Sequence, residues 1–190
     1  MRTGKLIQIA AIALAVGVWA GLPSRAAALT FNDARDLGSV RPPEPANPSD
    51  EEGYVNTLIS FAQGSGLHTV GIYTYNRKNV SCGTCPAAVF DHKDESGNNV
   101  VDLGSGGYTY LLAKYDGPNG GSEIWNVQGL TGTVTIPLFG FGHNNSQYGL
   151  SHWTLFRGEG GGGVPDGGAT VMLLGAALGA LGMMRRYLAR

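Results

Sequence analysis

The chain has 190 residues with a formal net charge of −1, 31 glycines and only 14% charged residues. Six of its thirteen basic residues lie before residue 26 or after residue 184, so the body between residues 29 and 163 holds seven basic and thirteen acidic residues. A body charge of −6 excludes the basic surface that nucleic acid requires, because the phosphates would be repelled. Abundant glycine without long helical patterns predicts a mainly β domain with tight turns.

The first 28 residues are typical of a secretory signal peptide. Arg2 and Lys5 precede a short apolar run, and small residues follow at Ala26 and Ala28. This order predicts cleavage after Ala28 by signal peptidase, once the export machinery has taken the chain to the membrane. An uncleaved anchor is less favoured, because the apolar run is short for a span of roughly 20 residues.

Residues 29–48 are expected to form an extended leader, because four prolines between residues 42 and 48 exclude a regular helix or a central strand. One helix is predicted to follow. Ser49 and Glu52 form a capping box at its start, and Gly64 is well placed as its C-cap. Its apolar face would hold Tyr54, Val55, Leu58, Ile59 and Ala62.

From Leu67 onward the hydrophobic period is two, which is typical of strands separated by turns rich in Gly, Asn and Asp. Seven strands are predicted, at residues 68–75, 87–92, 99–103, 108–115, 123–130, 133–139 and 150–156. This spacing favours a single antiparallel β-sandwich domain over residues 49–157, with the helix packed on a sheet.

The two cysteines lie close together in Cys82-Gly83-Thr84-Cys85. In an exported chain, a pair with no third cysteine is expected to form a disulfide. A thioredoxin-like redox pair is a weaker alternative, because that motif opens a helix and Pro86 with a strand-like run follows here. The two thiols with His68 or His92 would complete a metal site, but nothing in their spacing requires one.

Two acidic loops have features of calcium sites. Residues 91–102 have the length of an EF-hand loop, but Lys93, Glu95 and Ser96 occupy positions three, five and six, where oxygen ligands and a glycine are needed. Asp116 and Asn119 each precede a glycine and are turn formers first. We therefore expect no metal and no cofactor.

No catalytic signature stands out in the body. Ser151 and His152 are adjacent, but triad residues meet in space and the nucleophile-elbow motif is absent from the sequence. His152 alternates with Trp153 in a strand pattern, which favours a surface or pairing role. A glycosidase needs two convergent carboxylates, and any acidic domain of this size has many. The body is therefore expected to be non-catalytic.

The aromatic residues leave a carbohydrate-binding role open. Trp125, Trp153 and the tyrosines at positions 73, 75, 108, 110, 115 and 148 would form a sugar-stacking platform if they were exposed in a row. In a sandwich, however, alternate aromatic side chains mostly fill the core.

The chain ends in a three-part tail after a glycine-rich linker at residues 158–163. Val164-Pro165-Asp166-Gly167-Gly168 is followed by an apolar run at residues 169–184 and by a basic tail at residues 185–190 that begins with Arg185 and Arg186. The run would form about 24 Å of helix, and the arginines can reach the headgroups of a bilayer core of ~30 Å. The positive-inside rule then places the C-terminus in the cytoplasm.

This tail resembles the PEP-CTERM family of bacterial sorting signals, in the variant that begins Val-Pro-Asp-Ser-Gly, with Gly167 in place of the serine. The resemblance implies recognition of Pro165 and Asp166 by an exosortase, a membrane enzyme with a cysteine nucleophile that removes the tail in bacteria making exopolysaccharide. We therefore expect an exported surface or extracellular-matrix protein that is held transiently in the inner membrane. The alternatives are a carbohydrate-binding module acting on exopolysaccharide and, less favoured, a secreted hydrolase.

Overall fold

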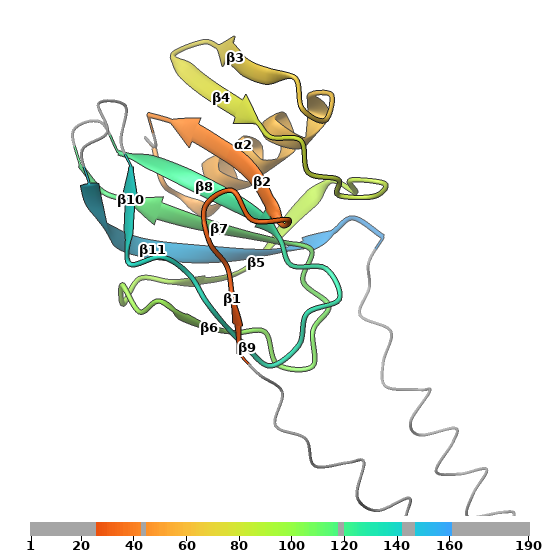
Figure 1. Cartoon of the computed structure of the whole chain (residues 1–190), viewed down its shortest axis with the longest axis vertical. Helices are drawn as coiled ribbons and strands as arrows, with labels where there is room; N and C mark the ends of the chain where they lie inside the picture. Colours follow the sequence, from red (N-terminus) through yellow and green to blue (C-terminus); the bar gives the residue numbers. More distant parts are fainter. Residues whose placement is uncertain (1–25, 43–44, 118–119, 142–146, 161–190) are drawn as a thin grey trace, which may run out of the picture.

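The computed structural model describes residues 26–42, 45–117, 120–141 and 147–160 (Figure 1). Most of the predicted signal peptide, the predicted membrane span and the sorting motif lie outside these residues. Within them, no helix has the length and apolar character needed to cross a membrane. The described elements are β1 (Ala27–Ala28), β2 (Asp36–Arg41), α2 (Pro48–Ser60), β3 (Gly66–Val70), β4 (Tyr73–Arg77), β5 (Ala88–Asp94), β6 (Val100–Asp102), β7 (Tyr110–Tyr115), β8 (Gly121–Asn126), β9 (Thr133–Thr135), β10 (Phe139–Phe141) and β11 (Gln147–Gly158).

A large antiparallel sheet dominates the fold. Seven of its strands run in the order β10-β11-β7-β8-β2-β4-β3, and β5 pairs with β11 outside this path. A smaller sheet has the order β1-β9-β6, in which β1 and β9 are parallel. Figure 1 shows the small sheet on one side of the large sheet and α2 on the other. For the residues that the structure describes, the predicted mainly β class with one short helix is confirmed.

Both faces of the large sheet are covered, and β7 shows this most clearly because all six of its residues are buried. Leu111, Ala113 and Tyr115 pack in the core that faces the small sheet. Tyr110 and Leu112 point the other way, into a second core beneath α2. The sandwich prediction therefore describes only the side where two sheets meet, since a helix covers the opposite face.

The predicted leader contains a central strand. The prediction that residues 29–48 form no central strand is therefore wrong for residues 36–41. β2 pairs with β4 on one side and β8 on the other, and both Leu37 and Val40 are fully buried. The prolines begin at Pro42, directly after the strand ends. Proline cannot donate to a sheet ladder, so the prolines fix where β2 stops instead of excluding it.

The predicted helix is confirmed, but its ends were placed wrongly. Asn47 is the N-cap, and its Oδ1 accepts a hydrogen bond from the Asp50 amide at 3.0 Å. Pro48 takes the first helical position, where its missing amide hydrogen costs nothing. Glu52 does not close a capping box, because its carboxylate accepts from the Phe90 amide on β5 at 2.8 Å. The C-cap is Phe61 and not Gly64.

Two of the seven predicted strands each correspond to two separate strands in the structure. Residues 68–75 are split between β3 and β4, which reverse at Gly71 with φ of +61°; a glycine at the first loop position is what a two-residue type II′ hairpin requires. Residues 133–139 are split into β9 and β10 on either side of Pro137. The other five predicted strands are confirmed with shifted ends.

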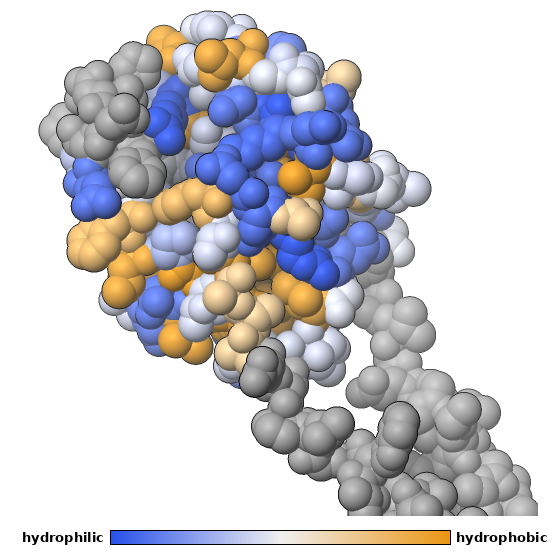
Figure 2. All heavy atoms as spheres, viewed as in Figure 1, coloured by the Kyte–Doolittle hydropathy of each residue, from blue (hydrophilic) through white to orange (hydrophobic). Residues whose placement is uncertain are grey.

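The surface carries hydrophobic residues in separate small patches. Figure 2 shows one over the β3–β4 hairpin and another near β10, with hydrophilic residues between them. Ile72 and Leu67 are 73% and 72% exposed on the hairpin, and Phe139 is 58% exposed on β10. Scattered residues of this kind are normal on a folded domain and do not define a partner surface.

Candidate functional site

The predicted cleavage site lies at the start of the described residues. Ala27 and Ala28 form β1, which pairs with Val134 and Thr135 of β9. Leu29 follows in the core that faces the small sheet, and its amide donates to the Thr135 carbonyl at 2.8 Å. Cleavage after Ala28 would therefore remove β1 and leave Leu29 in place. The sorting motif and the basic tail lie outside the described residues.

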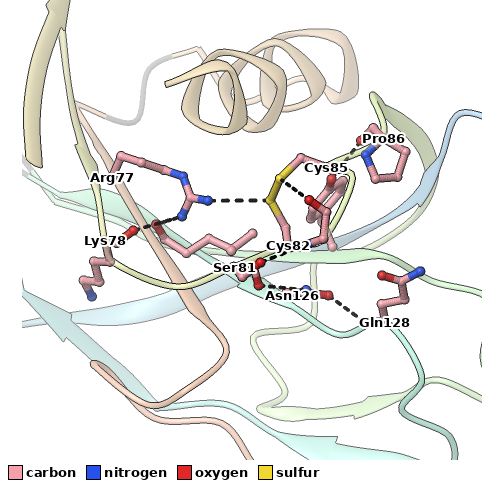
Figure 3. The surroundings of a disulfide bond; sticks show 11 residues. Arg77, Lys78, Ser81, Cys82, Cys85, Pro86, Asn126 and Gln128 are labelled. Carbon is pink, nitrogen blue, oxygen red and sulfur yellow. Dashed lines mark hydrogen bonds between the residues drawn. A yellow bond between two sulfur atoms is a disulfide. The ribbon is translucent and has the colours of Figure 1, made fainter. Parts of the chain in front are cut away.

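Cys82 and Cys85 form the predicted disulfide, with their Cα atoms 5.0 Å apart (Figure 3). Cys82 is buried in the core beneath α2, whereas Cys85 is only partly buried. Gly83 and Thr84, which connect them, are exposed. No helix follows Cys85, and β5 begins three residues later. Within the described ranges, no cluster of His, Cys, Asp and Glu side chains is suited to hold a metal ion.

A buried cation lies against this disulfide. Arg77, at the end of β4, is 2% exposed, and its Nη2 donates to Cys82 Sγ at 3.6 Å. Its Nη1 donates to the carbonyls of Leu37 and Lys78, each at 3.1 Å, while its Nε has no hydrogen-bond partner. In the part of the chain that the structure describes, no carboxylate pairs with Arg77. Burial lowers the pKa of its guanidinium from the ordinary value.

A hollow of about 250 Å³ lies near the β3 edge of the large sheet, and we call it the edge groove. Cross-strand pairing places its lining on one face, because Ser39 lies opposite Asn76 and Arg41 lies opposite Thr74. Leu67, opposite Asn76 on β3, adds the single apolar side chain of the lining. Most of the accessible surface of the groove is apolar, and its few hydroxyl, amide and guanidinium groups can hydrogen-bond the hydroxyls of a sugar.

Next to the edge groove, two buried carboxylates share one ammonium group. Glu123 lies opposite Ser39 and accepts from Lys78 Nζ at 2.5 Å. Lys78 also pairs with Asp36, which is fully buried. Burial, with the Asp36 carboxylate nearby, raises the pKa of Glu123 well above its ordinary value. Burial lowers the pKa of Lys78, but the two carboxylates raise it more.

The geometry of Asp36 ties this pair to the fold. Its Oδ2 accepts from the Asn32 amide at 2.6 Å, and its Oδ1 accepts from the Gly38 amide at 3.0 Å. A glycosidase carboxylate must reach the scissile bond of its substrate, whereas both oxygens of Asp36 are held by the backbone on either side. Through Lys78, the carboxylates of Asp36 and Glu123 hold the start of β2 against β8.

His152 is buried, so the predicted surface position is wrong, whereas the predicted pairing role agrees with its place opposite Lys114 in the strand ladder and its side-chain contact with Glu51. Its Nε2 lies 2.5 Å from Glu51 Oε1, and Glu51 Oε2 accepts from the Thr154 hydroxyl at 2.6 Å. Ser151 Oγ lies 3.3 Å from the other ring nitrogen. The alternation with Trp153 was right, but both faces of β11 are covered. The side opposite Trp153 therefore lies beneath α2 and not in solvent.

The aromatic residues are mainly core residues, as expected for the body of a β protein. Trp125 is fully buried and Trp153 is 4% exposed. Their indole nitrogens donate to the carbonyls of Thr30 at 3.1 Å and Asn98 at 2.9 Å. The tyrosines at positions 75, 110 and 115 are also buried, and those at positions 73, 108 and 148 are partly buried. A stacking platform built on the two tryptophans is therefore wrong.

Several groups in these clusters were missed by sequence reasoning. Arg77, Asp36 and Glu123 are charged residues inside or beside strand-like apolar runs, and this was the one signal that would have marked them. Their partners are distant in sequence; Asp36 and Lys78, for example, are 42 positions apart. Such pairings follow from the strand order, which the sequence pattern does not contain.

Comparison with known proteins identifies the C-terminal segment. Residues 163–188 match the family model described as the VPDSG-CTERM motif. No curated protein and no solved structure matched the chain. The chain is thus a sorting-signal protein. Its C-terminal sorting signal is PEP-CTERM-like. This signal suggests an exported protein and implies processing by an exosortase-type system.

Proposed function

We propose that this chain is a surface or extracellular-matrix protein with a non-catalytic body, released from a transient membrane anchor by an exosortase-type enzyme. The observation that carries the proposal is the sorting motif at residues 163–188. This segment includes the apolar run at residues 169–184 and the start of the basic tail, and a signal peptide at residues 1–28 would deliver the chain to the membrane. The body would then lie outside and the C-terminus in the cytoplasm.

The buried charges support a non-catalytic body. The carboxylates of Asp36 and Glu51 are both enclosed and both hydrogen-bonded to donors of the fold. A general acid or base must instead reach a proton on its substrate. The perturbed pKa of Glu123 has the same structural origin, because Glu123 is buried beside Asp36.

Replacing Pro165 and Asp166 together by alanine in the native host tests the sorting proposal. We expect the variant to stay in the membrane fraction with its tail intact, because the two recognised residues are gone. Replacing Gly161 and Gly162 of the linker by alanine is the matched control, and it should leave release unchanged. Normal release of the Pro165→Ala/Asp166→Ala variant would refute the proposal.

A second candidate function is carbohydrate binding, and the edge groove favours it. Four polar side chains and Leu67 line one concave site, and an exopolysaccharide would present hydroxyl groups to them. Calorimetric titration with exopolysaccharide from the host should show binding that Asn76→Ala weakens. Thr133→Ala, on β9 away from the groove, should leave the affinity unchanged. Equal affinity of the two variants would exclude the groove as the binding site.

A further inference from the structure

In the oxidised protein, the buried positive charge of Arg77 is only weakly compensated by its hydrogen-bond acceptors. Its guanidinium meets two backbone carbonyls and a disulfide sulfur, which is a poor hydrogen-bond acceptor. Its Nε has no partner, and no carboxylate of the described residues pairs with it. A buried charge without a counter-charge is unfavourable. The environment of Arg77 would therefore improve if a negative charge formed on Cys82.

Reduction of the disulfide can create this charge. A cation beside a thiol favours the thiolate and lowers its pKa, and charge-assisted hydrogen bonds are the stronger ones. Arg77 Nη2 already points at Cys82 Sγ from 3.6 Å (Figure 3). Arg77 therefore stabilises the reduced state relative to the oxidised state. In this respect it replaces the helix N-terminus that thioredoxin-like pairs use.

The fold depends little on this disulfide. Only two residues separate the cysteines, and closing so short a loop removes little entropy from the unfolded chain. Leu37, Val55 and Leu58 enclose the same core through apolar contacts. Reduction can therefore occur while the domain stays folded.

The two cysteines differ in their exposure to solvent. Cys82 is 1% exposed, whereas Cys85 is partly exposed and follows the exposed Gly83 and Thr84. An incoming thiolate can thus approach Cys85 from solvent, and Cys82 becomes the leaving group. The sulfur that leaves is the one that Arg77 contacts.

We propose that Cys82 and Cys85 form a reversible thiol–disulfide site that exchanges with an exogenous thiol, with Arg77 as the residue that stabilises the leaving thiolate. The exogenous thiolate attacks Cys85 Sγ, forming a mixed disulfide as the bond between the cysteines breaks. The electron pair of that bond goes to Cys82 Sγ. A second exogenous thiol then attacks the mixed disulfide and releases Cys85, so two electrons reduce the pair while the exogenous thiols are oxidised to their disulfide.

Redox titration of the full-length protein in detergent tests this inference directly. The oxidised protein is equilibrated with graded ratios of reduced and oxidised glutathione and quenched in acid. Its free thiols are then alkylated, and mass spectrometry counts them. We expect both cysteines to be reduced by millimolar glutathione with the far-ultraviolet circular dichroism unchanged. A pair that stays oxidised until denaturant is added would refute the proposal, whatever the fate of the sorting signal.

Variants of Arg77 test the role of the cation. Arg77→Met should lower the equilibrium constant for reduction by glutathione at least tenfold, about 30 mV for a two-electron couple. Arg77→Lys should restore part of this loss, and Arg157→Met on β11 should cause none. An unchanged constant in a folded Arg77→Met variant would refute the role of Arg77.

A measurement on the native arginine covers the case in which Arg77→Met does not fold. In a Cys85→Ala variant, Cys82 is a single thiol beside an intact Arg77. Its rate of alkylation should rise with pH through a midpoint below that of an ordinary thiol, because Arg77 favours the thiolate. A midpoint at or above the ordinary thiol pKa would contradict the assignment.

Discussion

Glu51 on α2 and His152 on β11 are 101 positions apart in sequence, yet their side chains lie 2.5 Å apart in the core between helix and sheet. Thr154 donates to the second oxygen of Glu51, and Lys93 Nζ lies 3.9 Å from the first. One carboxylate thus joins the helix to two strands of the large sheet. This contact fixes how the start of α2 sits on the sheet.

Removing this carboxylate should be costly for stability. Glu51→Ala leaves the polar atoms of His152 and Thr154 buried without their acceptor, so we expect the free energy of unfolding to fall by about 3 kcal/mol. The control is Glu95→Ala, because Glu95 also pairs with Lys93 but is 76% exposed. Urea denaturation followed by circular dichroism measures both. Equal midpoints for the two variants would contradict a structural role for Glu51.

The stability of the folded domain should fall as the pH rises from about 5 to 8. Burial and the Asp36 carboxylate raise the pKa of Glu123 from 4.5 to about 8, so the folded protein keeps a proton that the unfolded chain releases in this range. This contribution is complete below pH 4.5 and is lost as the pH passes the folded value. Glu123→Gln should flatten the curve. Denaturation of the wild-type protein and of Glu123→Gln over this pH range gives two series of unfolding free energies, and their difference isolates the effect of Glu123. A difference that does not change with pH would refute the protonation of Glu123 in the folded state.

The start of α2 can be tested with two neighbouring polar residues. Asn47 caps the helix, so Asn47→Ala should lower the free energy of unfolding by about 1 kcal/mol. Ser49→Ala should have almost no effect, because Ser49 lies inside the first turn. Thermal denaturation distinguishes the two positions. A larger loss of stability for Ser49→Ala would instead support Ser49 as the N-cap, in the capping box that the sequence pattern indicates.

Two glycines should respond to alanine in opposite directions. Gly38 has φ of +133° where β2 is irregular, and an added Cβ would lie 1.8 Å from the Asn76 carbonyl oxygen. Gly38→Ala should therefore destabilise the domain by at least about 3 kcal/mol. Gly53 lies inside α2 with no atom within 4 Å of an added Cβ, so Gly53→Ala should stabilise it by about 0.5–1 kcal/mol. Similar melting temperatures for the two variants would contradict this geometry.

Local patterns in the sequence predicted much of the secondary structure. Period-two runs located most strands, and the apolar face at Tyr54, Val55 and Leu58 located α2. The disulfide was predictable because two cysteines in an exported chain have only each other as partners. The ends of the elements were harder to place. At the helix, Asn47 and Ser49 are both good caps, and only the fold distinguishes them.

The charged clusters could not be predicted in the same way. Whether His152 is buried depends on what lies over its face of β11, and this is α2, about a hundred residues earlier. The strand at residues 36–41 was missed because the following prolines dominate the local composition. Its two neighbours, β4 and β8, come from distant parts of the chain. The sorting motif, in contrast, is read as a linear segment, so the sequence alone identified it.

Removal of the tail can be read from the intact mass of the mature protein from its native host, with and without the exosortase-type enzyme. Our expectation is a chain that begins at Leu29 and ends between Pro165 and Gly168, and that keeps its tail when the enzyme is absent. A mass corresponding to residues 29–190 in both strains would contradict it, because the tail would then be a permanent anchor.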